Sequence, residues 1–276
     1  MMLGNSHAPS IPLIDLKPFL EGNDEDTVVC QVTEACREIG FFAIRNHGIN
    51  SSVIGEMWRA SAAFFDSPLS EKELVMSADP SEYPFGYERS ENLELAKTGT
   101  KSFDDLKETF SIGPSNPASG MPARRIPLRP AGFELAITNY YEAMEQLAFN
   151  LAQIMALGLE LNRKHFVNKM DRHHSALRLL NYPNVTEPSP PGQLRAGAHT
   201  DYGAFTILKS GGPGLQVKRD QTMDSWVDVP TFDAEDVFII NLGDLMQRWT
   251  NGKSDRASPC MQTASTYSPD VIPLHD

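Results

Sequence analysis

Residues 197–208 read Gly-Ala-His-Thr-Asp-Tyr-Gly-Ala-Phe-Thr-Ile-Leu. His199 and Asp201 stand two positions apart, so in an extended chain or a tight turn both side chains project to the same side. An imidazole nitrogen and a carboxylate oxygen aimed at one point suit a metal site that keeps positions open for other ligands. Taken alone, a His-x-Asp pair also occurs at surfaces and as a cap, and both interpretations stay open at this point.

Short apolar runs surround this stretch and are separated by clusters of glycine, proline, aspartate or serine. They lie at 176–182, 205–208, 215–217, 226–229 and 237–240. Closely spaced runs of this kind are typical of an all-β sandwich or barrel. The first half of the chain instead has apolar residues at helical spacing. Because no obvious flexible linker separates the halves, we expect one integrated unit in which helices pack on a β core.

The expected elements of the first half are helices and short strands. Helices are expected at 24–39, 51–65, 67–74 and 133–161, the last continuing over 163–170, and strands at 11–16, 41–44 and 108–112. Gly40 is expected to end the first helix, and Ser51 or Ser52 to cap the second. The segment 76–131 is rich in glycine, proline, serine and charged residues, so we expect mostly loop there.

The chain is acidic and has few cysteines. Its 276 residues carry a formal net charge of -12, which argues against nucleic-acid or anionic-membrane partners. Cys30, Cys36 and Cys260 lack metal-site spacing and are too few for a disulfide framework. The sequence has no long apolar run and no apolar leader, so we expect neither a membrane span nor a signal peptide. These features favour a reducing compartment, the cytoplasm.

Several further motifs stand in a fixed order along the chain. They are found at 11–15, 40–42, 46–49, 86–87 and 107–110 before the His-x-Asp stretch, and at 214–217, 226, 230, 240–244 and 249–252 after it. Together with 197–208, these motifs resemble the isopenicillin N synthase-like family of iron(II)/2-oxoglutarate-dependent oxygenases. The resemblance covers about residues 11–253, and the number of independent motifs makes it specific.

The resemblance implies a mixed α and β fold, in which helices flank a jelly roll, also called a double-stranded β-helix. It implies an N-terminal domain at 1–120, an oxygenase domain at 121–253 and an atypical tail at 254–276. It also implies iron(II) bound by His199 and Asp201, with 2-oxoglutarate and dioxygen as cosubstrates. Decarboxylation of 2-oxoglutarate to succinate would accompany hydroxylation, desaturation or ring closure of a small organic molecule.

Other candidate residues have a structural alternative. Tyr182 stands where the family often has a tyrosine near the cosubstrate, but it is equally a half-buried strand tyrosine. His47 belongs to a structural turn in the family, so we do not expect it to be the third ligand. His173 and His174 are expected at the surface. For Arg178, a structural ion pair is at least as well supported as contact with substrate.

The sequence departs from the family pattern after Lys253. There the family has a strand with Ser-x-x-His-Arg, whose histidine is the third iron ligand, and about ten residues later an Arg-x-Ser that binds the distal carboxylate of 2-oxoglutarate. This chain reads Ser-Asp-Arg-Ala-Ser-Pro-Cys-Met at 254–261, and its only histidine after His199 is His275. We therefore expect the last strands of the jelly roll to be missing.

The codon table offers one explanation of the tail. If its codons are read one base later, they permit Ser-x-Thr-x-His-Arg and then, twelve positions after that histidine, Arg-x-Ser-x-Pro-Phe. Both missing motifs thus return in order. We interpret the tail from about Ser254 as the product of a frameshift, a sequencing error or an alternative splice junction, which sequencing the transcript through this junction would test.

Three alternatives follow from an authentic tail. His275 could return to complete the metal site, although a terminal segment next to proline tends to fray. The chain could be a catalytically inactive truncated isoform or pseudoenzyme of the same fold. It could also resemble those family members that use no 2-oxoglutarate. The substrate is not encoded in the fold, because loops such as 76–130 select it.

Overall fold

The computed structural model describes residues 11–77, 79, 85–89, 105–118, 120–183, 193, 195–218, 226–232, 236–250 and 260–263, the last of these as backbone only. The chain divides into two compact units. One, here called the two-sheet unit, comprises 1–47, 93–103 and 191–276. The other, the helix–sheet unit, comprises 48–92 and 104–190.

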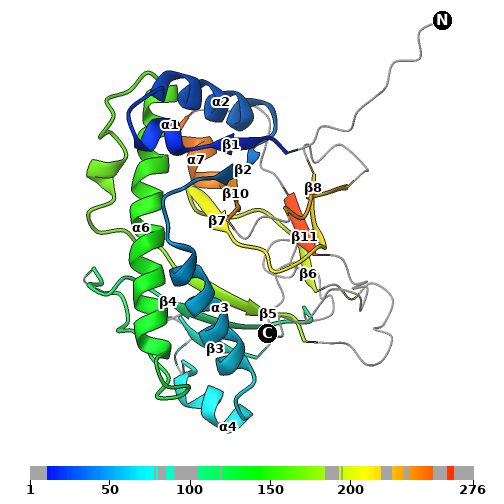
Figure 1. Cartoon of the computed structure of the whole chain (residues 1–276). Helices are drawn as coiled ribbons and strands as arrows, with labels where there is room; N and C mark the ends of the chain where they lie inside the picture. Colours follow the sequence, from blue (N-terminus) through cyan, green and yellow to red (C-terminus); the bar gives the residue numbers. More distant parts are fainter. Residues whose placement is uncertain are drawn as a thin grey trace, which may run out of the picture. The chain divides into compact units, whose positions relative to one another are not determined.

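The first sheet of the two-sheet unit pairs strands from the first 45 residues with strands from beyond residue 200 (Figure 1). Its order is β1 (Leu13–Asp15), β2 (Phe41–Arg45), β10 (Phe238–Leu242) and β7 (Phe205–Leu208). The β1–β2 pair is parallel, connected through α1 (Lys17–Leu20) and α2 (Glu25–Glu38), whereas β10 runs antiparallel to β2 and β7. Strand β10 is buried along its whole length, as its unbroken apolar run Phe-Ile-Ile predicts.

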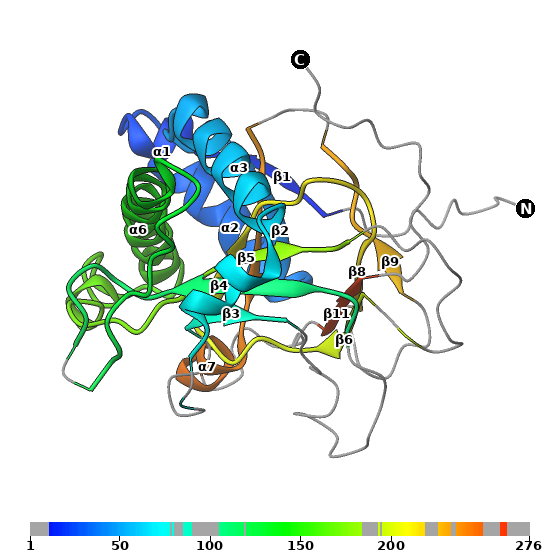
Figure 2. The same cartoon turned by 90° about the horizontal axis from the view of Figure 1, so that it is seen from below.

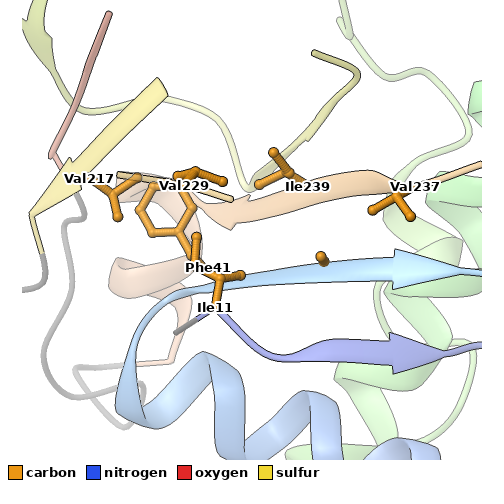
Figure 3. Packing of buried hydrophobic residues seen from close by; sticks show 7 residues of the cluster. Ile11, Phe41, Val217, Val229, Val237 and Ile239 are labelled. Atoms are coloured by element: carbon orange, nitrogen blue, oxygen red, sulfur yellow. The ribbon is translucent and has the colours of Figure 1, made fainter. Parts of the chain in front are cut away.

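The second sheet packs on the first through an apolar core. Its order is β6 (Ala196–His199), β11 (Cys260–Thr263), β8 (Leu215–Lys218) and β9 (Val227–Asp228). Figure 3 shows Val217 of this sheet next to Phe41 of the other, with Val229 and Ile11 nearby, in a cluster that also includes Ile239. Two sheets with one shared core form the sandwich expected of a jelly roll.

The tail contributes one strand, β11, so the expectation that the last strands are missing was wrong for this strand, and the remainder of the tail lies outside the described residues. Strand β11 lies between β6 and β8 and is antiparallel to both, with continuous register against β8 and a register shift against β6 between positions 261 and 263. The backbone groups of its two neighbours provide the hydrogen bonds, and Cys-Met-Gln-Thr contains no proline that would interrupt them. Position 261 is paired with His199.

The helix–sheet unit combines two long helices with a small sheet (Figure 2). Helix α3 (Ser51–Phe65) packs against α6 (Phe133–Gly158) and against β5 (Leu177–Asn181). The sheet has the order β3 (Gly86–Glu88), β4 (Glu108–Ile112) and β5. Short helical turns at α4 (Leu69–Lys72), η1 (Glu73–Val75) and η3 (Val167–Lys169) complete the unit. Phe64 lies 4.9 Å from Phe110 and 5.3 Å from Phe133, ring to ring, so aromatic packing joins helices and sheet.

Most elements expected from the sequence are confirmed, and the differences are local. Helix α3 has the expected bounds, but Asn50 caps it, accepting from Ser52 N–H at 2.9 Å, so the expectation of a serine cap was wrong. Gly40 follows α2 with a positive φ of 76°, as expected. Helix α6 ends at Gly158, and within 163–170 only η3 is helical. None of the described helices has the length and apolarity needed to cross a membrane.

Candidate iron site

His199, the last residue of β6, is held in the form that can bind a metal. Its Nδ1 lies 2.8 Å from the carbonyl oxygen of Gly197. Because a carbonyl oxygen can only accept a hydrogen bond, Nδ1 carries the ring proton. The neutral ring then has its lone pair on Nε2, and the backbone contact fixes the ring orientation.

Asp201 is held through one of its two carboxylate oxygens. Oδ2 accepts hydrogen bonds from Thr206 Oγ1 at 2.5 Å and from Asn241 Nδ2 at 2.8 Å. The other oxygen, Oδ1, lies 3.8 Å from His199 Nε2. Two ligand atoms that each lie about 2.1 Å from one metal are separated by at most about 4.2 Å. The pair therefore fits around one metal ion.

The turn that follows His199, residues 200–204 and here called the ligand turn, is bound by the start of α7 (Asp244–Trp249). Three backbone N–H groups donate to three of its carbonyl oxygens: Gly243 to Ala204 at 3.0 Å, Asp244 to Asp201 at 2.8 Å and Leu245 to Gly203 at 3.1 Å. In addition, Thr200 Oγ1 donates to Asp244 Oδ2 at 3.3 Å. The turn that carries Asp201 is thus fixed on several sides.

Gly243 is required by this close approach. A Cβ atom at this position would collide with the carbonyl oxygens of Gly203 and Asp201. Both oxygens belong to backbone that is already hydrogen-bonded to Asp244 and Leu245. The glycine therefore allows the start of α7 to touch the ligand turn.

The described residues offer two candidate protein ligands for iron, His199 and Asp201. Within them, no group of three or more histidine, cysteine, aspartate or glutamate side chains could hold a metal. The strand next to β6, where a histidine would be expected from the resemblance, carries Cys-Met-Gln-Thr. His275 lies outside the described residues. An imidazole nitrogen and a carboxylate oxygen suit iron(II) chemically, but the pair covers only two of the three ligands.

The remaining predicted residues have other partners. His47 Nε2 lies 2.6 Å from Asp236 Oδ1, so this buried ring serves the structural role expected of it. His173 is half-buried, with Nε2 2.8 Å from Glu145 Oε1, and its expected surface position was wrong. His174 is exposed, as expected.

Tyr182 and Arg178 belong to the helix–sheet unit. Tyr182 directly follows β5 and is half-buried. Arg178 Nη2 lies 4.0 Å from Glu88 Oε2, an ion pair at the limit of contact distance. The cosubstrate role of Tyr182 stays a prediction.

Two residues of the site were not singled out by sequence reasoning. Thr206 and Asn241 lie within motifs that carried the resemblance, but nothing in their spacing indicated contact with Asp201. The available signal was Asn241 itself, an amide in the otherwise apolar strand Phe-Ile-Ile-Asn-Leu, where it is fully buried. A buried amide needs a hydrogen-bond partner and therefore indicates a nearby polar group.

Comparison with known proteins identifies the family of this chain. Residues 11–131 match the family model of the non-haem dioxygenase in morphine synthesis N-terminal domain, and residues 173–266 match the 2OG-Fe(II) oxygenase superfamily. The 2-oxoglutarate-dependent dioxygenase traH of Penicillium crustosum is 32% identical over 255 residues, covering 88% of this chain and 76% of the relative. Clavatol oxidase claD of the same organism is 32% identical, covering 88% of this chain and 78% of the relative.

Solved structures agree as well. The full-length T7H of Neurospora crassa in complex with alpha-KG superimposes with a TM-score of 0.81 at 26% identity, covering 96% of this chain and 82% of that one. The jelly-roll fold, the alpha-KG bound to that relative and the sequence identities all indicate the same family. This chain belongs to the iron(II)/2-oxoglutarate-dependent oxygenases, oxidoreductases that act on small organic molecules with iron(II), 2-oxoglutarate and dioxygen.

Proposed function

We propose that this chain holds iron(II) between His199 Nε2 and Asp201 Oδ1 and oxidises a small organic molecule. The observation that carries the proposal is that hydrogen bonds hold one polar atom of each side chain and leave the other atom for a metal. The backbone contact at Nδ1 leaves Nε2 for the metal, and the two donors at Oδ2 leave Oδ1. These two remaining atoms lie 3.8 Å apart.

The chemistry is a coupled oxidation. Iron(II) held by His199 and Asp201 would supply the family's chemistry, in which dioxygen oxidises 2-oxoglutarate to succinate and carbon dioxide, one oxygen atom goes to succinate and the other to a hydroxylated product. Desaturation or ring closure would release that second oxygen atom as water. His199 and Asp201 bind the metal, and the Tyr182 hydroxyl is proposed to donate a hydrogen bond to the cosubstrate. A half-buried strand tyrosine remains the alternative for Tyr182.

The substrate class is a small organic molecule. Relatives are named for clavatol and for a flavonoid, and T7H has been crystallised with thymine. Because these substrates differ, the fold does not carry substrate identity to this chain. The N-terminal motifs support a place among the isopenicillin N synthase-like members. The net charge of -12 supports a protein without nucleic-acid or membrane partners, and the free thiols of Cys30 and Cys36 support the cytoplasm.

Iron binding tests the proposal directly. We expect anaerobic titration of the 276-residue protein to show one weak iron(II) site per chain. His199→Ala should raise its dissociation constant by about 100-fold, the upper end of what even outer partners of a metal contribute. His174→Ala, which changes an exposed histidine, is the matched control and should bind like the parent. Equal binding by the parent and His199→Ala would refute the assignment, and succinate formation with 2-oxoglutarate reports turnover.

The described residues offer no third ligand, and this leads to a second prediction. Positions 261 and 199 are direct partners in the antiparallel β6–β11 pair. Such partners share a face of the sheet, with Cβ atoms about 4.5–5.5 Å apart. A thioether prefers softer metals than iron(II). We therefore expect Met261→His to lower the iron(II) dissociation constant by at least about tenfold and to raise the rate of succinate formation.

The control for this variant lies one residue along the strand. Successive positions of a strand belong to opposite faces, so Gln262→His should leave iron affinity unchanged. If the two histidine variants bind iron(II) equally, position 261 does not face the metal pair. We also propose that the unusual tail reflects a shifted frame, and the transcript through codon 254 is the direct test.

A further inference from the structure

We infer that Thr206 and Asn241 are positioning residues that aim Asp201 at the metal through Oδ1 alone. This inference rests on the proposed iron site. A carboxylate can bind a metal through one oxygen or through both, and nothing in its own chemistry selects between these modes. In this protein the neighbouring strands make the selection.

The two donors converge because of strand register. Thr206 on β7 and Asn241 on β10 are direct partners in the antiparallel pair, so their side chains stand on the same face. Both donate to the same atom, Asp201 Oδ2, at 2.5 and 2.8 Å. Two hydrogen bonds from two strands occupy Oδ2, whereas Oδ1 lies 3.8 Å from His199 Nε2.

A buried amide at position 241 lowers the stability of the folded protein, which a purely structural role would not explain. The residue is fully buried in an apolar strand, and within the described part of the chain its Oδ1 has no hydrogen-bond partner. A buried acceptor without a partner costs about 1–3 kcal/mol, whereas an apolar side chain of similar shape would avoid this cost. Reversing the amide would place its oxygen against Asp201 Oδ2, so the orientation is determined by the carboxylate. The folded protein thus loses some stability at Asn241, and in return the amide holds Asp201 in place.

One bound oxygen also leaves room for the cosubstrate. A carboxylate that turns to bind through both oxygens takes an additional position on the metal. The chemistry of this family needs open positions for 2-oxoglutarate and for dioxygen. With a third protein ligand on the metal, as in the family pattern, Thr206 and Asn241 would keep Asp201 from occupying a position that the reaction uses.

The test compares Thr206→Val, Thr206→Ser and Asn241→Leu with the parent. Valine keeps the shape of threonine and removes the donor, whereas serine keeps the donor. Each protein is titrated anaerobically with iron(II) and, separately, with cobalt(II), whose visible absorption reports the number and geometry of its ligands. We expect Thr206→Val and Asn241→Leu to raise the iron(II) dissociation constant about 10–100-fold and to change the cobalt(II) spectrum. Thr206→Ser, which keeps the donor, should resemble the parent in both properties.

Thermal melting of the metal-free proteins distinguishes a loss of metal affinity caused by a misplaced Asp201 from one caused by destabilisation of the fold. The leucine variant should melt close to the parent, because removal of the buried Asn241 acceptor offsets the lost hydrogen bond from Asn241 Nδ2 to Asp201. If Thr206→Val binds both metals like the parent, or if serine and valine lose affinity equally, the inference is wrong. It is also wrong if the loss of affinity follows a matching loss of melting temperature. A parent that binds no iron(II) would instead refute the iron site itself, and this inference with it.

Discussion

Replacing Gly243 by alanine should lower the free energy of unfolding by about 3 kcal/mol, the upper end of overpacking costs, and displace the ligand turn. The added Cβ would collide with the carbonyl oxygens of Gly203 and Asp201. These are backbone atoms held by the start of α7, so no flexible side chain can move aside. We expect the melting temperature to fall by about 6–12 °C and iron(II) affinity to fall with it.

The same turn provides a matched control. A Cβ atom on Gly203 meets no atom within 4 Å, and its backbone is not in the left-handed region. Gly203→Ala should therefore melt and bind iron(II) like the parent. Similar melting temperatures for the two alanine variants would show that the contact between α7 and the ligand turn is loose, contrary to the geometry described above.

The second large effect is expected at Glu108, in the helix–sheet unit. Its Oε2 accepts from Lys72 Nζ at 2.8 Å and from Tyr87 OH at 2.5 Å, and its Oε1 accepts from Asn181 Nδ2 at 2.8 Å. The side chains of Lys72 and Glu108 are only 10% and 15% exposed. Glu108→Gln keeps the shape but leaves the Lys72 ammonium without its counter-charge. Loss of one partner of a buried pair costs about 3–5 kcal/mol, and we expect the low end because Lys72 also donates to Phe65 O.

A double variant tests the electrostatic origin of this effect. Adding Lys72→Met to Glu108→Gln removes the orphaned charge, and replacing a buried ion pair by uncharged groups is often close to neutral. The double variant should therefore be more stable than Glu108→Gln alone in urea unfolding. If it is less stable by the sum of the two single losses, the charges are not coupled.

The same cluster gives a pH dependence. Burial alone would raise the pKa of Glu108, but hydrogen bonds from Lys72, Tyr87 and Asn181 and the charge of Lys72 outweigh it and hold this pKa below its ordinary value. A depressed carboxylate pKa stabilises the folded state fully above the unfolded pKa, and this contribution is lost as the pH falls through the folded value. Unfolding measured between pH 6 and about pH 3 should lose less stability in Glu108→Gln than in the parent.

The helices and strands that the sequence predicted best are those whose signal is local. Helix α3 and strand β4 have the expected bounds, because apolar spacing and flanking polar residues suffice to define them. The cap of α3 was misassigned because Asn50, Ser51 and Ser52 are all good caps, and only the chain path selects among them. Strand β3 has three residues and depends on its pairing with β4, which periodicity cannot reveal.

The candidate site divides in the same way. His199 and Asp201 could be proposed from the sequence, since two positions along an extended chain share a side and the resemblance to the oxygenase family implies iron at this pair. Thr206 and Asn241 are 35 residues apart and meet through the register of β7 and β10, which is a property of the sheet. His173 was misplaced for a similar reason, because its partner Glu145 lies on α6.

The pairing of β2 with β10 has a consequence for protein synthesis. Phe41 pairs with Asn241, which the ribosome adds about 200 residues later. At a synthesis rate of roughly 5–20 residues per second, β2 is made about 10–40 s before this neighbour. During that interval the helix–sheet unit, whose segments lie between the two strands in sequence, is already being made. The nascent chain meanwhile carries Phe-Phe-Ala-Ile with one open strand edge, a segment that invites aggregation and that chaperones would need to shield.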